Sequence, residues 1–441
     1  MQNRRNFILM SAVVATRAVP VLGANEQVNV AVIGLGGRGT AHIGLLAHQQ
    51  NCRIAAVCDV NQAAQERAVA LVERTQGHKP TVYQDMRRVF DDKQIDAVSM
   101  ATPNHWHALG MIWACQAGKD VYVEKPACHN IWEGRQMIAA ARKYARIVQV
   151  GSQSRSTAMK IRAIQLIRDG IIGKVYMAKG ICYKWRPSIG RTAVEPTPPG
   201  INWDLFLGPA PMRPFTMNRF RYNWHWFWDT GNGDLGNQGV HEVDIARWAL
   251  GEIGMPKSVD STGGKFVYDD DQETPNVQSC AFDYGDRRIV FEVHGLHTGS
   301  DSDIVGDVGN IIYGSDGYMA VDPTGFRVFK GKACPTQTTG PSRCVREKVM
   351  EEKAVGPEGG YDATAHFGTF LKAVRSRKHE DLTAGIETGV ASASLCHLAN
   401  ISYRLGRRLP FDASTGRFAD ADANRMLSRD YRAPYVVREK I

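Results

Sequence analysis

A glycine-rich segment stands near the start of the chain, at residues 34–39, where the sequence reads Gly-Leu-Gly-Gly-Arg-Gly. It directly follows a β-branched run at residues 28–33, and Asp59 comes 20 residues after its last glycine. A strand, a glycine-rich turn and a helix, followed by such an acid, are typical of a dinucleotide-binding fold. The helix amides would bind the pyrophosphate. Asp59 would accept hydrogen bonds from the ribose hydroxyls and would repel a 2′-phosphate. The pattern therefore favours NAD over NADP; the alternative is a glycine turn that binds no ligand.

Two more polar segments follow predicted strands. Residues 102–107 read Thr-Pro-Asn-His-Trp-His, and residues 124–126 read Glu-Lys-Pro. The loops at the carboxyl ends of parallel strands line the ligand crevice, although either segment alone could be a surface turn. A lysine in that crevice can polarise a hydroxyl or carbonyl group and favour an alkoxide. The cofactor contacts expected from these loops are Gly34, Gly36, Gly37, Arg38, Gly39, Asp59, Thr102, Asn104, His107, Glu124 and Lys125.

Short apolar runs alternate with helical patterns over the first third of the chain, as at residues 106–117 and 131–144. Such runs predict a parallel sheet that helices cover on both faces. We therefore expect an α/β fold that begins with an NAD-binding Rossmann domain at residues 27–152. Its strands are expected at residues 28–33, 53–58, 97–101, 120–123 and 147–150.

The remainder, residues 153–441, has a different pattern. Strand-like stretches separated by turn signals predict an α+β domain with a large, open-faced, mainly antiparallel sheet. Residues 331–360 are expected to form a long polar loop. The predicted strands are 175–185, 278–284, 288–295, 310–313, 318–322 and 325–329, and the predicted helices are 158–169, 366–376 and 384–405.

With these motifs the sequence resembles the Gfo/Idh/MocA oxidoreductase family over nearly all of the chain after the first 24 residues. A fourth motif adds to the resemblance, at residues 231–244, which read Gly-Asn-Gly-Asp-Leu-Gly-Asn-Gln-Gly-Val-His-Glu-Val-Asp. The resemblance implies NAD(P)-dependent oxidation or reduction of sugars, inositols and their derivatives. It also implies that Lys125 and His241 face the nicotinamide together, and that the open sheet packs in dimers or tetramers.

One position departs from the family pattern. The family dehydrogenases commonly carry an aspartate four residues before the histidine, and here that position is Asn237. An amide cannot accept a proton, so His241 would work with Lys125 alone or with another carboxylate. Asp244 lies one helical turn from His241 and is a candidate, with a helix-surface carboxylate as the alternative. The catalytic group predicted from the resemblance is Lys125, His241 and Asn237; for His241, a buried structural histidine is the alternative.

An aromatic run, residues 222–228, precedes this motif and reads Tyr-Asn-Trp-His-Trp-Phe-Trp. Aromatic side chains can form the apolar platform on which the C–H face of a sugar stacks, or they can form a packed plug in the core. Tyr183, Lys184 and Arg186, at the end of the first strand of the second domain, are further candidates for hydroxyl or carboxylate contacts. The predicted substrate contacts are Tyr183, Arg186, Tyr222, Trp224, His225 and Asp244.

Two reactions fit these motifs. The first is hydride transfer from a ring carbon of a sugar, glycoside or cyclitol to NAD. The second is glycoside cleavage, in which some relatives use transient oxidation by bound NAD, elimination and re-reduction without net redox change. A non-catalytic protein that holds NAD is a third reading, which Lys125 and His241 argue against. The sequence leaves open the sugar and the carbon that is oxidised.

Composition excludes other classes of protein. The chain has 441 residues, 43% of them hydrophobic and 22% charged, which is ordinary for a globular protein. The net charge of +9 is spread along the chain, so we expect no nucleic-acid partner, and no apolar run is long enough to span a membrane. The nine cysteines form no Cys-x-x-Cys pair, so no metal site is expected. Cys334 and Cys344 could pair in an exported protein.

Residues 1–24 have their own pattern. Arg4 and Arg5 directly precede an apolar stretch that ends near Leu22, and the small residues Gly23 and Ala24 follow. This arrangement resembles a twin-arginine export signal. It predicts a periplasmic protein that leaves the cytoplasm folded, with its cofactor bound. A basic N-terminus on a cytoplasmic protein is the alternative.

Overall fold

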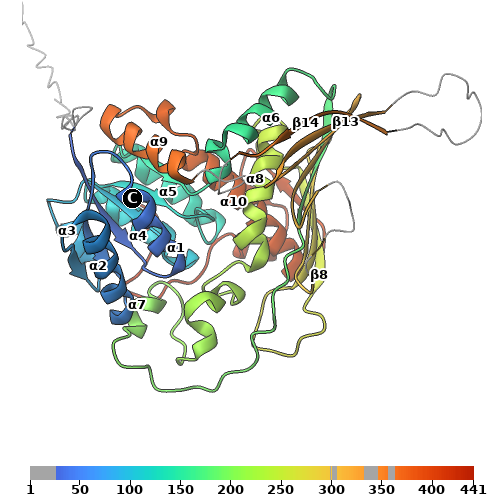
Figure 1. Ribbon diagram of the computed structural model, residues 1–441. Coiled ribbons are helices and arrows are strands. Elements are labelled where there is room, and N and C mark those ends of the chain that lie inside the picture. Colours follow the sequence, from blue (N-terminus) through green and yellow to red (C-terminus); the bar gives the residue numbers. More distant parts are fainter. Residues whose placement is uncertain (1–25, 298, 300–304, 332–345, 356–362) are drawn as a thin grey trace, which may run out of the picture.

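The computed structural model describes residues 26–297, 299, 305–331, 346–355 and 363–441. Two sheets with helices between and around them make up the molecule (Figure 1). The proposed signal segment and the pair Cys334 and Cys344 lie outside the described residues. Among the described helices, none is both long and apolar enough to cross a lipid bilayer.

The first sheet has six parallel strands in the order β3-β2-β1-β4-β5-β6. All five predicted strands are present, because their near-continuous apolar runs are buried on both faces. The sixth, β3, is a three-residue edge strand with two exposed positions, so it carries no hydrophobic signal. The strands are β1 Val28–Ile33, β2 Cys52–Cys58, β3 Thr81–Tyr83, β4 Ala97–Met100, β5 Asp120–Val123 and β6 Val148–Val150.

Helices cover both faces of this sheet (Figure 1). Side chains of α1 and α2 share one apolar cluster with the sheet, and those of α3, α4 and α5 share another. Helix α9 comes from the far end of the chain, yet its apolar face belongs to the first of these clusters. The bounds are α1 Gly37–Ala47, α2 Gln62–Gln76, α3 Met86–Asp91, α4 Asn104–Gln116, α5 Ile131–Lys143 and α9 Ala363–Ser376.

The second sheet has ten strands in the order β14-β13-β12-β11-β7-β10-β9-β8-β15-β16. The central pair, β7 and β10, is parallel, and the other described pairs are antiparallel. This confirms the predicted mainly antiparallel sheet. Its strands are β7 Val175–Cys182, β8 Ser258–Gly264, β9 Val277–Asp283, β10 Arg288–His294, β11 Val308–Gly314, β12 Gly317–Asp322, β13 Gly325–Gly331, β14 Arg346–Lys353, β15 Leu409–Asp412 and β16 Arg417–Phe418.

The prediction of a loop throughout residues 331–360 is wrong, because β14 lies within that range. Its sequence, Arg-Glu-Lys-Val-Met-Glu-Glu-Lys, is mostly charged. It pairs with β13 at the edge of the sheet. Charged side chains are common on edge strands, where they discourage pairing with other chains, and they hide the alternation that marks a strand.

Three helices pack on the face of this sheet that looks toward the first domain: α6 Ala158–Arg168, α8 Val240–Ala249 and α10 Ile386–Leu405 (Figure 1). Alternate residues of β7 divide between the two faces: Ala178 and Cys182 join the helices, and Ile181 belongs to a separate cluster on the outer face. In the described ranges no helix covers that outer face (Figure 1). The sheet is therefore open-faced, as the sequence predicts.

The end of the chain returns to the first domain. The ring of Tyr435 packs edge-on against Trp106 at 5.5 Å, and the Tyr431 hydroxyl donates to Glu133 at 3.1 Å. Two short helices, α7 Trp203–Leu207 and α11 Ala421–Arg425, complete the described helical elements. Because α9 and the C-terminal segment both pack on the first sheet, the second domain is anchored there at several points.

The packing of α9 generates a stability prediction. Phe367 is fully buried and stacks on Tyr122 of β5, with ring centroids 4.1 Å apart and planes 18° apart. Truncation would leave a cavity between helix and sheet, so Phe367→Ala should lower the free energy of unfolding by about 3–5 kcal/mol. Denaturant unfolding of the variant and the wild type measures this difference; a loss within about 0.5 kcal/mol, the range of surface substitutions, would contradict the proposed packing.

Candidate active site

The glycine-rich turn between β1 and α1 is built for close approach. Gly34 has a φ of +84°, and a Cβ there would lie 2.7 Å from the carbonyl group of Ala101 on the neighbouring strand. A Cβ on Gly39 would strike the carbonyl oxygen of Gly34. At Gly36 and Gly37, in contrast, the Cβ position faces open space, and both residues are exposed at the start of α1. This leaves the amides of the first helical turn accessible to a phosphate.

Asp59 follows β2 and ties its end to the glycine turn. One carboxylate oxygen accepts the Leu35 amide at 2.5 Å, and the other accepts the Asn61 amide at 2.8 Å. Burial raises the pKa of Asp59, and the two amides oppose that rise. A carboxylate has about four lone-pair sites, so it can still accept ribose hydroxyls after these two bonds.

The segment after β4 contributes an unsatisfied hydroxyl. Thr102 is buried, and among the described residues no group bonds to its Oγ1. A buried hydroxyl of this kind indicates a missing ligand or water, so it fits a bound dinucleotide. Asn104 has a different use from the expected one: its Nδ2 donates to Asn232 Oδ1 at 2.9 Å and so joins the two domains. His107 lies between the carbonyl oxygens of Thr102 and Pro126, at 2.8 and 2.7 Å, and thereby fixes both loops to each other.

Arg38 and Glu124, both predicted to contact the cofactor, also contact each other: Arg38 Nε donates to Glu124 Oε1 at 2.7 Å. The same oxygen contacts His42 Nε2 at 3.0 Å and accepts Gln153 Nε2 at 3.1 Å. Burial alone would raise the pKa of Glu124, but Arg38, His42 and Lys125 together hold it well below its usual value. A buried carboxylate needs such partners, so Glu124 stabilises the loop, whereas the Arg38 side chain is still 40% exposed.

Lys125 crosses from the first domain to the second. Its Nζ donates to the backbone oxygen of Asn237 at 2.7 Å and lies 3.4 Å from the Asn237 side-chain oxygen. Asn237 belongs to a π-helical turn, Leu235–Gly239, of the kind often found at functional sites. Burial lowers the pKa of Lys125; Arg38 lowers it further, whereas Glu124 opposes the shift. The ammonium can therefore lose its proton more readily than a surface lysine.

His241 lies in the first turn of α8, directly after the π-helical turn, and is 8% exposed. Burial lowers its pKa far below the usual value, and the charge of Lys125 adds to that effect. At neutral pH the imidazole is neutral and can accept a proton. The structure thus brings the predicted pair within electrostatic reach, although the two residues are far apart in sequence.

The aromatic run forms a 3₁₀ helix, Arg221–Trp226, beside the π-helical turn. Tyr222 is 51% exposed, and its hydroxyl accepts Asn237 Nδ2 at 2.9 Å. Trp224 stacks on His225 with centroids 3.6 Å apart, and burial lowers the pKa of His225 to about 3. Trp226 is buried and acts as part of the core. The run therefore combines both sequence interpretations, a packed plug at Trp226 and exposed rings at the site.

Two predicted substrate contacts are used elsewhere. The Tyr183 hydroxyl donates to Glu292 at 2.8 Å and its ring stacks on His294 at 4.3 Å, in the cluster on the outer face of the sheet. Strand alternation turns it away from the site. Arg186 does lie on the inner side, but it forms two 2.9 Å bonds with Asp234. Its charge is therefore already paired.

Asp244 is engaged in a buried ion pair. Its carboxylate oxygens accept Arg155 at 2.7 and 2.9 Å, and one of them also accepts the Ser392 hydroxyl at 2.6 Å. The Arg155 and Asp244 side chains are only 5% and 1% exposed. The helical spacing that suggested a partner for His241 places Asp244 in a buried ion pair that joins α8 to α10 and to the segment before α6.

Sequence reasoning named Lys184 as a candidate contact but gave no role to its neighbours Gln238 and Glu242. Lys184 Nζ donates to Gln238 Oε1 at 2.9 Å, and Gln238 Nε2 donates to Glu242 Oε1 at 3.2 Å. The i, i+4 spacing of Gln238 and Glu242 around His241 was the available signal. Lys184 could not be linked to them by spacing, because it comes from the end of β7.

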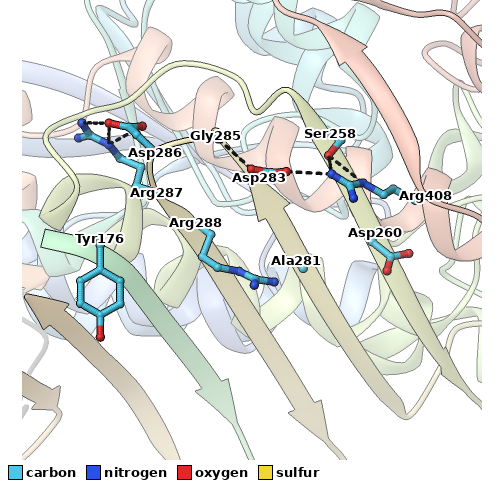
Figure 2. A pocket seen from close by; sticks show the side chains of 10 residues that line it. All are labelled: Tyr176, Ser258, Asp260, Ala281, Asp283, Gly285, Asp286, Arg287, Arg288 and Arg408. Carbon is cyan, nitrogen blue, oxygen red and sulfur yellow. Dashed lines mark hydrogen bonds and ion pairs between the residues drawn. The ribbon is translucent and has the colours of Figure 1, made fainter.

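A described hollow lies elsewhere. It has a volume of about 440 Å³ and sits on the outer face of the second sheet, where Tyr176, Asp260, Ala281 and Arg288 point out from adjacent strands (Figure 2). None of the described site residues lines it. Its ionic groups are largely paired, with Arg408 bonded to Asp283 and Arg287 bonded to Asp286, both at 2.8 Å (Figure 2). The residues described above lie away from this hollow, where the carboxyl edge of the first sheet meets the π-helical turn.

The buried pair generates a prediction that separates stability from chemistry. Asp244→Asn should lower the free energy of unfolding by about 3–5 kcal/mol, because it leaves the Arg155 guanidinium buried with less compensation. The catalytic rate of the folded fraction should change little. Thermal unfolding and turnover per folded molecule measure the two effects, and a large loss of turnover without a loss of stability would return Asp244 to the catalytic group.

Comparisons with known proteins agree with this geometry. An alpha-N-acetylgalactosaminidase of Shewanella oneidensis is 29% identical over 154 residues, or 34% of each chain, so the match spans about a third of that relative. The WlbA dehydrogenase from Bordetella pertussis, solved with NADH and UDP-GlcNAcA, superposes with a TM-score of 0.62 and 19% identity, covering 88% of this chain and 99% of that one. Levoglucosan dehydrogenase, solved with NADH and levoglucosan, superposes with a TM-score of 0.65 and 19% identity, covering 87% of this chain and 99% of that one. Both likenesses are likenesses of fold.

Family descriptions match most of the chain. Residues 28–152 fit the Gfo/Idh/MocA oxidoreductase family, NAD-binding Rossmann fold. Residues 157–306 and 358–437 fit the C-terminal alpha/beta domain of the same family. The glycine turn, Asp59 and the unsatisfied Thr102 hydroxyl are the features that such a cofactor requires of the first domain. The chain belongs to the Gfo/Idh/MocA family of NAD-binding oxidoreductases.

Proposed function

We propose that the protein is an NAD-dependent oxidoreductase that acts on a hydroxyl group of a sugar, glycoside or cyclitol. The observation that carries the proposal is Lys125, whose ammonium leaves the carboxyl edge of the first sheet and bonds to Asn237 of the second domain. A titratable cation thus lies where a dinucleotide and a substrate held by the second domain would meet. The sugar ligands named for WlbA and levoglucosan dehydrogenase support the choice of substrate class.

The first domain would hold the cofactor through the amides around Gly36, the carboxylate of Asp59 and the hydroxyl of Thr102. NAD, when bound, supplies a hydride acceptor. The remaining task falls to the protein: to orient a hydroxyl-bearing carbon and to take the hydroxyl proton. His107 assists by fixing the loops that carry Thr102 and Lys125.

Proton transfer would use Lys125 Nζ and the neutral imidazole of His241. Burial lowers the pKa of both groups, which favours their deprotonated forms near neutral pH. Asn237 takes no proton. Its backbone oxygen holds the Lys125 ammonium, and its amide holds the Tyr222 hydroxyl. Asn237 would therefore position the catalytic pair.

Sugar binding would use the exposed ring of Tyr222 and the half-buried ring of Trp224, against which the C–H face of a sugar can stack. Lys184 adds a half-buried ammonium on the inner side of β7, and it is a better candidate for a hydroxyl contact than the paired Arg186. His225 supports Trp224 from behind.

A second candidate is glycoside cleavage by transient oxidation, elimination and re-reduction. The specific observation in its favour is the match to an alpha-N-acetylgalactosaminidase, a glycoside-cleaving enzyme by name. Two acid–base groups in one crevice suit both the removal of an acidified C–H proton and the protonation of a leaving oxygen. The reaction would show no net change in the redox state of NAD.

Export through the twin-arginine route is a further part of the proposal. Arg4 and Arg5 before an apolar stretch support it, and a periplasmic enzyme would have to carry its NAD out bound to the folded chain. Cell fractionation of the wild type and an Arg4→Lys, Arg5→Lys double variant tests this. Cytoplasmic retention of the wild type contradicts export.

The proposal also includes a homo-oligomer formed through the outer face of the second sheet. In the described part of the chain no helix covers that face, and the Tyr176 ring on it is 48% exposed, beside the buried cluster of Ile311, Ala320 and Phe329. A sheet face without a covering helix, with exposed apolar groups on it, favours association. Light scattering at several concentrations measures the mass, and a monomer throughout contradicts this part.

Loss of either catalytic group should lower turnover by about 10²–10⁴-fold, the usual contribution of a positioned proton acceptor. The variants are Lys125→Ala and His241→Ala, measured by steady-state kinetics on the best substrate. NAD binding, followed by the quenching of tryptophan fluorescence, should be largely retained. Near-normal turnover in one variant removes that residue from the mechanism.

A substrate panel separates the two reactions. The protein is purified without added nucleotide, its bound cofactor is identified by mass, and free sugars, cyclitols and aryl glycosides are then offered. We expect NADH to accumulate on a free sugar or cyclitol. Release of the aryl group without NADH favours the cleavage mechanism instead, and inactivity on every class with NAD bound contradicts the proposed function.

A further inference from the structure

The acids around Lys125 and His241 differ in how they are neutralised. Asp234 is paired with Arg186, and Asp244 is paired with Arg155. Glu242 is held differently: its carboxylate accepts an amide, from Gln238 Nε2 at 3.2 Å. When Glu242 is ionised, its neutral amide partner therefore offsets less of the negative charge than the arginines offset at Asp234 and Asp244.

Glu242 is confined directly behind the π-helical turn. It follows His241 in α8 and is 1% exposed. On the sheet side it packs against β7 so closely that a Cβ on Gly180 would lie 2.9 Å from the Glu242 Cβ. Its backbone oxygen accepts Asn310 Nδ2 of β11 at 2.8 Å. The side chain therefore has little freedom to turn toward solvent.

Charged groups from several elements face this carboxylate. The charge of Lys160 on α6 lowers the pKa of this carboxyl group. The Lys160 ammonium donates to Ser154 at 3.0 Å, and the charge of Asp322 on β12 raises its pKa. Lys184, at the end of β7, reaches it through Gln238. In the first domain, the charge of Glu242 raises the pKa of Lys125. Glu242 thus interacts electrostatically with Lys160 and Lys184 of the second domain and with Lys125 of the first.

The electrostatics agree with this placement. Burial raises the pKa of Glu242 to about 7, and the Gln238 bond and Lys160 keep it from rising further. Burial likewise lowers the pKa of Lys160 to about 8. Glu124, Asp234 and then the Glu242 anion oppose the burial-driven fall in the pKa of Lys125. A change of charge at Glu242 near neutral pH is therefore transmitted to the proposed catalytic lysine.

We propose that Glu242 is a positioning residue that supplies, from behind the π-helical turn, the negative charge that Asn237 does not provide. It touches neither substrate nor cofactor. It acts by setting how readily Lys125 and His241 take the proton of the substrate hydroxyl. This inference rests on the proposed function, because it concerns the proton-transfer step of that reaction.

The first test is the pH profile of kcat/KM for Glu242→Gln, which keeps the shape of the side chain and can still accept from Gln238. Without the anion, the catalytic base loses its proton more readily. The acidic limb of the profile, over which kcat/KM rises as the base loses its proton, should therefore move to lower pH. We expect a shift of about one pH unit, as is usual when one neighbouring charge is removed. Glu387→Gln, which removes an exposed carboxylate paired with Arg142, is the matched control and should leave the limb in place.

Charge rescue distinguishes an electrostatic role from a structural one. Asn237→Asp alone should move the acidic limb to higher pH, because it adds an anion beside Lys125. Combined with Glu242→Gln, it should return the limb toward the wild-type position. If Glu242→Gln lowers turnover without moving the limb, or if Asn237→Asp fails to move it, Glu242 is a structural residue and the inference is wrong.

A second readout needs neither substrate nor NAD. The folded-state pKa of Glu242, about 7, lies above its ordinary value of 4.5. The folded protein therefore holds a proton that the unfolded chain has released, and the stability this residue contributes below that ordinary value is lost as pH rises through about 7. The wild type should lose stability relative to Glu242→Gln between about pH 5 and about pH 8.

The two readouts separate the possible failures. A stability difference that does not change with pH shows that Glu242 does not titrate and overturns the inference. Normal wild-type turnover with an unshifted limb in Glu242→Gln contradicts the role of Glu242 alone. Absence of wild-type turnover on the whole panel contradicts the proposed function itself, and with it the inference.

Discussion

The bond between the Lys125 ammonium and the backbone oxygen of Asn237 is the interaction on which the site depends. It joins the carboxyl edge of the first sheet to a π-helical turn of the second domain, and it holds a buried charge at the junction. A buried ammonium is unfavourable unless it is bonded, so this contact also constrains how the two domains meet. The bond from Asn104 to Asn232 reinforces the same alignment.

Around that bond, some charged residues stabilise the loops and others are suited to proton transfer. Glu124 is surrounded by Arg38, His42 and Gln153, and Asp244 by Arg155 and Ser392. These clusters satisfy buried groups and hold the loops, and they leave the charged side chains little freedom to meet a ligand. The groups that remain suited to chemistry are those whose buried environment weakens the charged form, above all Lys125 and His241.

Most of the fold could be predicted because its signals are local. The strands at residues 28–33 and 120–123 are buried on both faces and read as apolar runs, and the glycine turn follows from steric needs that only glycine meets. The missed strands lack such signals: β3 is short and exposed, β14 is charged along most of its length, β8 has one apolar side chain, and β15 and β16 have four and two residues. Their strand structure depends on a neighbour to pair with, which no local pattern reveals.

The sequence by itself determined the type of cofactor and the Rossmann order of elements, and it singled out Lys125 and His241, which lie within electrostatic reach of each other. Only the tertiary structure decided which charged residues are engaged with one another. Arg38, Arg186 and Asp244 have the side chains a ligand site needs, but ion pairs with residues distant in sequence occupy them. The same long-range packing brings Lys184, Gln238 and Glu242 together. Spacing along a chain specifies which residues share a strand or helix face, whereas the pairing of charges depends on distances between elements that only the folded core fixes.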